Sequence, residues 1–281
     1  MLKALRQLRV VFIVYDMIPV LFPAWGFQKH LDLYLSHFLN VIDVADAVLC
    51  ISQCTERDLR AFAESRSRKP PVTHVIRLGA DLPAEEDPEG IAPALLQKLS
   101  GGKFAIAVGT FEVRKNYGLL LDVWDRLAPD QEFDLDLVIV GMRGWEADHV
   151  IDRLEASTLH GRRIFWLCDL GDGAVSWLYA RCHVVLYPSL YEGWGLPVVE
   201  ALQHRRPVIA SNRGAVPEAG SGIAQIIDPD DLPAWCEAIA VIARAPRADT
   251  PAIMLPSWDE TAAMTRSILM STPVMGWKAS A

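Results

Sequence analysis

Short apolar runs alternate with amphipathic segments through the second two-thirds of the chain, and no other feature constrains its fold as strongly. Continuously apolar runs of strand length that alternate with helical patterns predict a parallel β-sheet covered by helices on both faces. The predicted strands are Phe104–Gly109, Leu135–Gly141, Ile164–Cys168, His183–Tyr187, Pro207–Ser211 and Ala224–Ile227. The predicted helices are Tyr117–Leu127, Glu146–Ser157, Val175–Arg181, Pro197–His204, Val216–Ala219 and Leu232–Ala243. We therefore predict a complete, doubly wound Rossmann-like α/β domain that binds ligands at the carboxyl ends of its strands.

The first third of the chain also has α/β character but, at about 80 residues, is short for a doubly wound domain. Its predicted strands and helices are Val10–Tyr15, Ala47–Ile51, Val72–Ile76, Leu31–Val44 and Thr55–Ala63. The acidic segment Ala80–Gly90, which contains Pro and Gly, is typical of a linker. Ser257 and Glu260 have capping-box spacing at the start of a helix predicted over Ser257–Met270. The predicted organisation is a truncated α/β domain over 1–85, the complete domain over 86–256, and a final helix with a tail over 257–281.

Composition excludes several classes of protein. The 27 basic and 35 acidic residues give a formal net charge of −8 without a basic stripe, which argues against a nucleic-acid partner. No stretch approaches the ~20 apolar residues of a membrane helix, because Asp16 and Pro19 interrupt the best candidate, Val10–Phe22. The opening residues lack the pattern of a signal peptide. The five cysteines form no CxxC pair, which favours packing in a reducing compartment over disulfides or a zinc site. We expect a cytoplasmic protein.

The opening residues have a short basic amphipathic pattern. Such a helix could lie on the inner surface of a membrane, or it could pack on the small domain. Because it spans roughly two to three turns and lacks aromatic residues, packing is favoured. The pattern consists of Leu2, Leu5 and Leu8 with Lys3, Arg6 and Arg9.

The segment from Tyr191 to Glu200, YEGWGLPVVE, follows a predicted strand and opens a helix. Its two glycines allow a ligand to approach the backbone closely, and Pro197 suits a first helical turn. The free N–H groups of that turn form an anion site. We expect Glu192 at the loop mouth and Glu200 in the first turn. Carboxylates repel phosphate unless they accept hydrogen bonds from hydroxyls, so the pattern indicates a sugar nucleotide. A glycine-rich turn followed by a favourably placed Glu is the alternative, and the residues alone leave both open.

The segment from Gly109 to Asn116, GTFEVRKN, follows the first strand of the complete domain. Arg114 and Lys115 are therefore predicted at the same sheet edge as Glu192, where two cations can bind a diphosphate and stabilise it as a leaving group. Taken alone, a solvated charged turn capped by Asn116 is the favoured alternative. Convergence of both segments on one edge shifts the balance toward a site.

These segments together resemble a family 4 glycosyltransferase. The resemblance rests on GTFEVRKN, LVIVG, YPSLYEGWGLPVVEAL, PVIASNRGAVPEAG and SWDETA, in that order, and it spans roughly Ile51 to Met270. Glu192 and Glu200 match the E-x7-E motif of that family. The stretch YDMIPVLFP resembles a segment found late in the N-terminal domain of the family. The resemblance implies a GT-B fold, in which two Rossmann-like domains face each other and the C-terminal domain holds most of a nucleotide-sugar donor.

The resemblance also implies roles for particular residues. Arg114 and Lys115 are expected to hold the diphosphate, and Glu192 to contact the donor sugar, so these three are the expected catalytic residues. Glu200 is expected to accept hydrogen bonds from the ribose. The remaining expected donor-binding residues are Gly109, Thr110, Leu170, Gly193, Trp194, Gly195 and Leu196.

The chain also departs from the family pattern. By this resemblance, the chain is expected to lack most of the N-terminal domain, including its first strand and its Gly-rich loop. Tyr15 stands where many relatives have His, and Thr110 where many have Arg. The predicted function is a retaining hexosyltransferase, with a weak preference for mannose, that acts on a polysaccharide or lipid-linked glycan. The alternative is a non-catalytic nucleotide-sugar-binding module, or one that depends on a partner chain or self-association.

No metal or cofactor is expected. Asp134-Leu-Asp136 precedes a strand and so lies at the opposite end from the ligand edge, and Asp228 to Asp231 suit the cap of the next helix. The seven histidines have no metal-binding spacing, and His183 is interpreted as structural. A GT-B nucleotide-sugar epimerase is less favoured because Arg114 and Lys115 occur together with the paired glutamates. A nicotinamide dehydrogenase is poorly supported because no G-x-G-x-x-G follows a strand.

Overall fold

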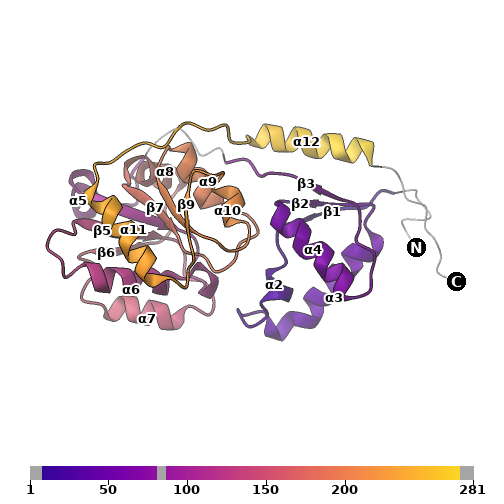
Figure 1. The fold of residues 1–281 in the computed structure, drawn as a ribbon, viewed down its shortest axis with the longest axis horizontal. Coiled ribbons are helices and arrows are strands. Elements are labelled where there is room, and N and C mark those ends of the chain that lie inside the picture. The colour runs from indigo at the N-terminus through magenta and orange to yellow at the C-terminus, as the bar shows by residue number, and fades with distance from the viewer. Residues whose placement is uncertain (1–7, 81–86, 273–281) are drawn as a thin grey trace. The chain divides into compact units, whose positions relative to one another are not determined.

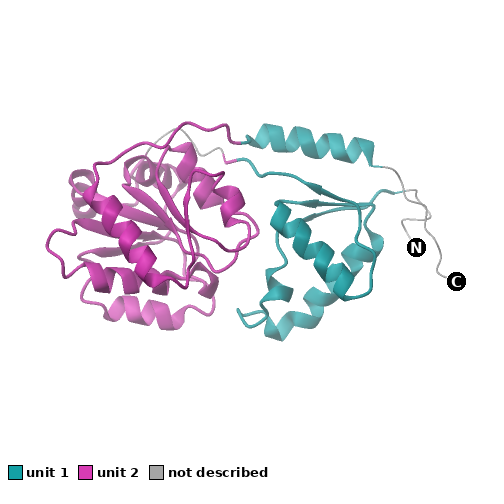
Figure 2. Cartoon of the chain, in the orientation of Figure 1, with its two compact units in different colours: residues 1–79, 256–281 teal, residues 80–255 magenta. Residues whose placement is uncertain are grey.

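The computed structural model describes residues 8–80 and 87–272, and the chain forms two compact units (Figures 1 and 2). Unit 1 contains residues 1–79 and 256–281, and unit 2 contains residues 80–255. Of the expected amphipathic pattern, Leu2 to Arg6 lie outside the described residues, and Leu8 and Arg9, which are described, are not helical. The centre of the expected linker, 81–86, also lies outside the described residues.

Unit 2 is built on a parallel sheet, which has six strands in the order β6-β5-β4-β7-β8-β9 within residues 87–255. The bounds of each strand differ by at most one residue from those predicted. The prediction succeeded because a strand that is buried on both faces of its sheet is a continuous apolar run in the sequence. The order places the ends of β4 and β7 side by side, since these two strands are hydrogen-bonded neighbours. The strands are β4 (Lys103–Val108), β5 (Leu135–Val140), β6 (Ile164–Leu167), β7 (Val184–Tyr187), β8 (Val208–Ser211) and β9 (Gln225–Ile227).

Helices cover both faces of this sheet (Figure 1). Residues of α6, α7 and α11 form one hydrophobic core with the strands, with Trp124 and Trp235 fully buried in it. The helix α5 and the 3₁₀ helix η2 had not been predicted from the sequence. The helical elements are α5 (Pro93–Gly101), η2 (Val113–Lys115), α6 (Tyr117–Leu127), α7 (Asp148–Ala156), α8 (Asp172–Arg181), α9 (Leu196–Gln203), α10 (Val216–Ala219) and α11 (Leu232–Arg244).

Unit 1 has a parallel sheet with the order β1-β2-β3 over its described residues. Its core joins Val14, Cys50, Phe38 and Leu59 from the strands and helices. Ser52 caps α4 by accepting a hydrogen bond from the Thr55 N–H at 2.9 Å. The elements are β1 (Val11–Val14), α2 (Ile18–Leu21), η1 (Gln28–His30), α3 (Leu31–Val44), β2 (Ala47–Cys50), α4 (Gln53–Ser65), β3 (Thr73–Val75) and α12 (Trp258–Ser271).

The final helix α12 belongs to unit 1 although it follows unit 2 in sequence. Thr261 Oγ1 donates a hydrogen bond to the Arg77 carbonyl at 2.6 Å. Arg9 donates to the Leu269 carbonyl near the other end of the helix at 2.7 Å. The predicted capping box is present, because Ser257 and Glu260 bond each other's backbone N–H groups. These contacts tie both ends of α12 to residues from the first third of the chain.

The cysteines are free thiols, and Cys50, Cys54 and Cys182 are buried. Burial raises the pKa of Cys50 and that of Cys182 each to about 12, so both remain neutral packing groups. Among the described helices, none is both long enough and apolar enough to cross a membrane.

Candidate functional site

Two loops meet at the carboxyl edge of the sheet in unit 2. The cationic loop, residues 109–116, follows β4, and the glutamate loop, residues 188–195, follows β7. The Leu190 N–H donates to the Arg114 carbonyl at 2.7 Å. The Asn116 amide donates to the Pro188 carbonyl at 3.3 Å. These bonds hold the loops together, as the strand order requires.

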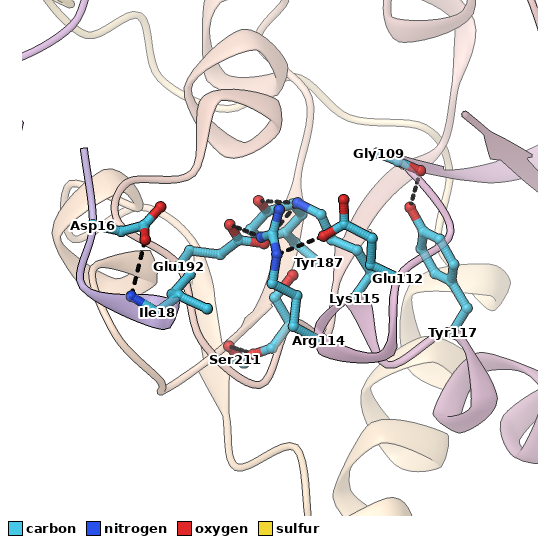
Figure 3. Close-up of polar contacts among 11 residues, drawn as sticks. Asp16, Ile18, Gly109, Glu112, Arg114, Lys115, Tyr117, Tyr187, Glu192 and Ser211 are labelled. Carbon is cyan, nitrogen blue, oxygen red and sulfur yellow. Dashed lines mark hydrogen bonds and ion pairs between the residues drawn. The ribbon is translucent and has the colours of Figure 1, made fainter. Parts of the chain in front are cut away.

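Four charged side chains form one cluster between these loops, and we call Glu112, Arg114, Lys115 and Glu192 the charge cluster (Figure 3). Lys115 Nζ lies 2.6 Å from Glu192 Oε1. Arg114 donates one N–H to Glu192 Oε2 and its Nε–H to Glu112 Oε2, the latter at 2.7 Å. The side chains of Lys115 and Glu192 are each only 9% exposed, so these pairs are little screened by water.

The cluster keeps Glu192 and Arg114 ionised. Burial favours a neutral Glu192, but the attraction of Lys115 and then of Arg114 outweighs burial and holds the pKa of Glu192 below its ordinary value. Burial by itself lowers the pKa of Arg114, whereas the attraction of Glu192 and then Glu112 raises it above its ordinary value. Glu192 therefore stays a carboxylate and Arg114 a cation within the cluster.

Aromatic residues shape the wall of the cluster. Lys115 Nζ lies 5.1 Å from the centre of the Tyr187 ring and 3.2 Å from its hydroxyl. Tyr117 donates its hydroxyl to the Gly109 carbonyl at 2.7 Å. Gly109 has φ +147°, and a Cβ there would lie 3.1 Å from Lys115 Cε. Glycine is favoured here because side chains rarely adopt this backbone conformation, and a Cβ would also press against the lysine stem.

The glutamate loop is also fixed from the β8–α10 connection. The Ala215 N–H donates to the Glu192 carbonyl at 3.0 Å. Gly214 has φ +57°, and a Cβ there would lie 2.6 Å from that same carbonyl oxygen. Ser211 donates its hydroxyl to the Ser189 carbonyl at 2.6 Å. The segment SNRG thus sets the backbone position from which Glu192 reaches the cations.

The remaining glutamate-loop residues lead into α9. Gly195 has φ +142° and precedes Leu196, the first residue of the helix. Trp194 is buried, and its indole N–H has no hydrogen-bond partner among the described residues. As the first residue of α9, Leu196 has no acceptor within the helix for its N–H, and this N–H together with the positive end of the helix dipole suits an anion.

Two expectations about these loops were wrong, and one alternative interpretation does not hold. Glu192 is not at the loop mouth but is 7% exposed, because its ion pairs draw it inward. The alternative of a solvated charged turn capped by Asn116 does not hold, because the Asn116 side chain makes no cap hydrogen bond and donates to the glutamate loop instead, and Glu112 and Lys115 of the turn are buried. Glu200 is the fifth residue of α9 and therefore begins its second turn.

The other predicted donor-binding residues lie apart from these ion pairs. Glu200 accepts a hydrogen bond from the buried Tyr179 hydroxyl at 2.9 Å. Burial raises the pKa of Glu200 above its ordinary value despite that bond. Leu170 is half-buried in the loop after β6, beside Gly90. Thr110 is half-buried beside Gly144. The structure therefore gathers Gly109, Arg114, Lys115 and Glu192, while Leu170 and Glu200 occupy separate places.

The acidic residues and the histidine that were not assigned to a metal site make hydrogen bonds and ion pairs within the fold. Asp136 pairs with Lys98 at 2.6 Å and with Arg163 at 2.7 Å. Asp231 caps α11 by accepting from the Ala234 N–H at 3.0 Å. The His183 ring bonds the Ala245 carbonyl at 3.0 Å. The described residues contain no group of three or more His, Cys, Asp or Glu side chains suited to a metal ion.

Sequence reasoning missed four residues that shape the site: Glu112, Tyr117, Tyr187 and Gly214. Glu112 carried a usable signal, because an acid two residues before Arg114 can pair with it. The others carried no local signal, since Tyr187 ends an apolar strand and Gly214 contacts the glutamate loop only through space.

Among curated proteins, the chain is similar to bacterial mannosyltransferases. The chain is 34% identical over 209 residues to the serotype-specific mannosyltransferase WbdA of Escherichia coli, which covers 70% of this chain and 25% of that protein. It is 30% identical over 197 residues to the O-antigen chain mannosyltransferase B of Escherichia coli, which covers 69% of this chain and 50% of that protein. The chain therefore spans a quarter to a half of the length of these curated relatives.

Two solved structures share the fold. Sucrose-phosphate synthase from Thermosynechococcus elongatus matches with a TM-score of 0.72 and 22% identity, over 95% of this chain and 69% of that one. Anabaena HepE, solved in complex with UDP-glucose, matches with a TM-score of 0.72 and 18% identity, over 96% of this chain and 74% of that one. The α/β fold with parallel sheets is that of the GT-B glycosyltransferases. The family model "Glycosyl transferases group 1" matches residues 93–235, half of the chain, and the chain therefore belongs to the group 1 glycosyltransferase family.

Proposed function

We propose that this chain is a retaining glycosyltransferase of family 4. It moves a hexose, with mannose favoured, from a nucleoside diphosphate sugar to a polysaccharide or lipid-linked glycan. The observation that carries the proposal is the charge cluster, which places Arg114 and Lys115 beside Glu192 at the carboxyl edge of a parallel sheet. Ligands of open α/β sheets bind at this edge. The names of the curated relatives support mannose as the transferred sugar.

The charge cluster suits the departure of a diphosphate. When the bond between the sugar C1 and the phosphate oxygen breaks, its electron pair stays on the diphosphate, and the sugar gains oxocarbenium character. Arg114 and Lys115 stabilise the negative charge that develops, and the N-terminus of α9 adds its dipole. The acceptor hydroxyl forms the new bond to C1 on the face that the diphosphate leaves, and its proton passes to the departing diphosphate oxygen. The proposed reaction uses no metal or cofactor, because the two cations supply the charge.

A second candidate function is a nucleotide-sugar-binding module that transfers sugar only together with a partner chain or a second copy. It is favoured by the small sheet of unit 1, whose described strands are β1, β2 and β3. A cytoplasmic location, with contact at the inner face of the membrane, belongs to the same proposal, because lipid-linked acceptors lie there.

A transfer assay tests the proposal. The protein is incubated with GDP-mannose, UDP-glucose or a dTDP-hexose and with a mannan oligosaccharide, and the products are measured by mass spectrometry. We expect one donor to extend the oligosaccharide, and Lys115→Ala to lower the rate about 100-fold or more. Lys103→Ala is the matched control, because Lys103 caps α11 at the opposite edge of the same sheet.

Three outcomes separate the candidates. Transfer that depends on Lys115 but not on Lys103 supports the enzyme. Donor binding without transfer supports the partner-dependent module. Transfer that is unchanged in Lys115→Ala contradicts the assignment of the site.

A further inference from the structure

We propose that Glu192 sets a preference for the intact nucleotide sugar over the free nucleoside diphosphate, by serving as the counter-anion of Lys115 and Arg114 in the empty site. The inference rests on the proposed function and adds a second role for Glu192. It makes Glu192 a specificity residue that favours release of the product.

The first step of the argument is the charge balance. The charge cluster has two carboxylates and two cations, so its formal charge is zero. Both oxygens of Glu192 are occupied, with Oε1 on Lys115 at 2.6 Å and Oε2 on Arg114. A diphosphate that reaches these cations therefore meets a neutral cluster and competes with a carboxylate that is already in place.

The second step is that the two carboxylates bind Arg114 differently. Glu112 bonds Arg114 through its Nε–H, on a different side of the guanidinium from the N–H that bonds Glu192. Glu112 stands on the cationic loop itself, two residues from Arg114, and holds its guanidinium in place. Glu192 comes from the facing loop, where Gly193 and Gly195 flank Trp194. The diphosphate can therefore replace Glu192 while Glu112 keeps its bond to Arg114.

The third step is the cost of displacing Glu192. A buried carboxylate that loses its cations and gains no donors is strongly unfavourable, and it also repels a neighbouring phosphate. The hydroxyls of a donor sugar replace the lost N–H donors. A nucleoside diphosphate without a sugar offers no such replacement. Glu192 therefore opposes the binding of the free diphosphate more than that of the donor, and it returns to the cations after transfer.

Calorimetry on Glu192→Gln tests this inference with the nucleotide that the wild-type protein binds, as diphosphate and as diphosphate sugar. The amide keeps the shape of the side chain but removes the counter-anion. We expect the variant to bind the free diphosphate about tenfold more tightly or better, because one opposing charge is gone. We expect it to bind the donor more weakly. If Glu192 only contacted the sugar, its replacement would weaken donor binding but would not strengthen binding of the free diphosphate.

Glu200→Gln is the matched control. It also removes a carboxylate, from the half-buried Glu200 in the helix that follows the glutamate loop, but Glu200 bonds Tyr179 rather than a cation. We expect it to leave the affinity for inorganic pyrophosphate unchanged, whereas Glu192→Gln raises that affinity. Glu192→Ala serves as a second variant, and melting curves show that each protein is folded.

The outcomes distinguish this inference from the function on which it rests. Diphosphate affinity that is unchanged or lower in both Glu192 variants overturns the counter-anion role, while the proposed function stands if the donor still binds. Failure of the folded wild-type protein and its variants to bind any nucleotide contradicts the proposed function, and the counter-anion role with it.

Discussion

Glu192 and Glu200, eight positions apart, occupy opposite electrostatic environments. Glu192 lies among cations that hold its pKa below the ordinary value, against the effect of burial. Glu200 is half-buried, its partner is the neutral hydroxyl of Tyr179, and burial raises its pKa. Ionised Glu192 therefore stabilises the fold near neutral pH, whereas ionised Glu200 destabilises it.

Replacement of Glu192 by Gln is expected to lower the free energy of unfolding by about 3 kcal/mol at pH 7, because it leaves buried cations without a counter-charge. A lowered pKa in the folded state means that the contribution is complete above the ordinary pKa of Glu and is lost as the pH falls through the folded value. Urea unfolding at pH 7 and at pH 3 checks this. A loss of equal size at both pH values would contradict it.

Replacement of Glu200 by Gln is expected to have the opposite sign. Its raised pKa means that folding opposes ionisation, so the cost is present at neutral pH and disappears below the ordinary pKa of Glu. The Gln oxygen can still accept the hydrogen bond from Tyr179. Unfolding at pH 7 should show the variant to be more stable than the wild type, and a lower stability there would count against this assignment.

Gly214→Ala is expected to reduce both stability and sugar transfer. Its Cβ would lie 2.6 Å from the Glu192 carbonyl oxygen and 2.7 Å from the Glu192 nitrogen, so the backbone of Glu192 must shift. We expect the free energy of unfolding to fall by about 2–3 kcal/mol. Gly222→Ala is the control, because Gly222 also has positive φ but has open space around it. That control should lose about 1 kcal/mol and retain transfer.

At the scale of elements, the first turn of α12 is stabilised by the side chain of Ser257 in the capping box. Ser257→Ala removes the acceptor of the Glu260 N–H, which lies 3.1 Å from Ser257 Oγ. We expect this change to lower the stability of the first turn of α12 by about 1 kcal/mol. Hydrogen exchange of the Glu260 and Thr261 amides measures this. Ser267→Ala, in the middle of the same helix, should leave those amides protected, since Ala is a good helix former.

The elements show how far sequence patterns reach. All nine strands described in the structure were predicted within about one residue, because apolar runs in parallel sheets are continuous and end at turns. The helix α5 was missed although Pro93 and Leu99 suit a helix start and a buried face. The short α2 lies inside an apolar run and has no helical period.

At the scale of the whole chain, the return of α12 to unit 1 depends on a glycine. A Cβ at Gly79 would lie 2.3 Å from the Trp258 backbone nitrogen. Gly79→Val should therefore displace the start of α12 and expose it to hydrogen exchange and proteolysis. Gly101→Val is the control, because a Cβ there meets no atom within 4 Å. Equal protection of α12 in both variants would contradict a fixed packing against Gly79.

The site could be predicted from the sequence only in part. Topology alone placed Arg114, Lys115 and Glu192 at one edge, because parallel strands end on the same side. The burial of Glu192 and its pairing with both cations depend on the side chains that face one another across two loops. The tight contact of Gly214 with Glu192 depends on the packing of a third loop. Such through-space relations leave no periodic trace in the sequence.

A crystal structure of the chain with its nucleotide-sugar donor tests the central claim most directly. The account predicts that phosphate oxygens lie within about 3 Å of Arg114 and Lys115, at the carboxyl edge of the sheet. It also predicts that Glu192 leaves these cations and accepts hydrogen bonds from the sugar, while Glu112 stays on Arg114. A donor bound elsewhere, with Glu192 still paired to Lys115, would contradict the account.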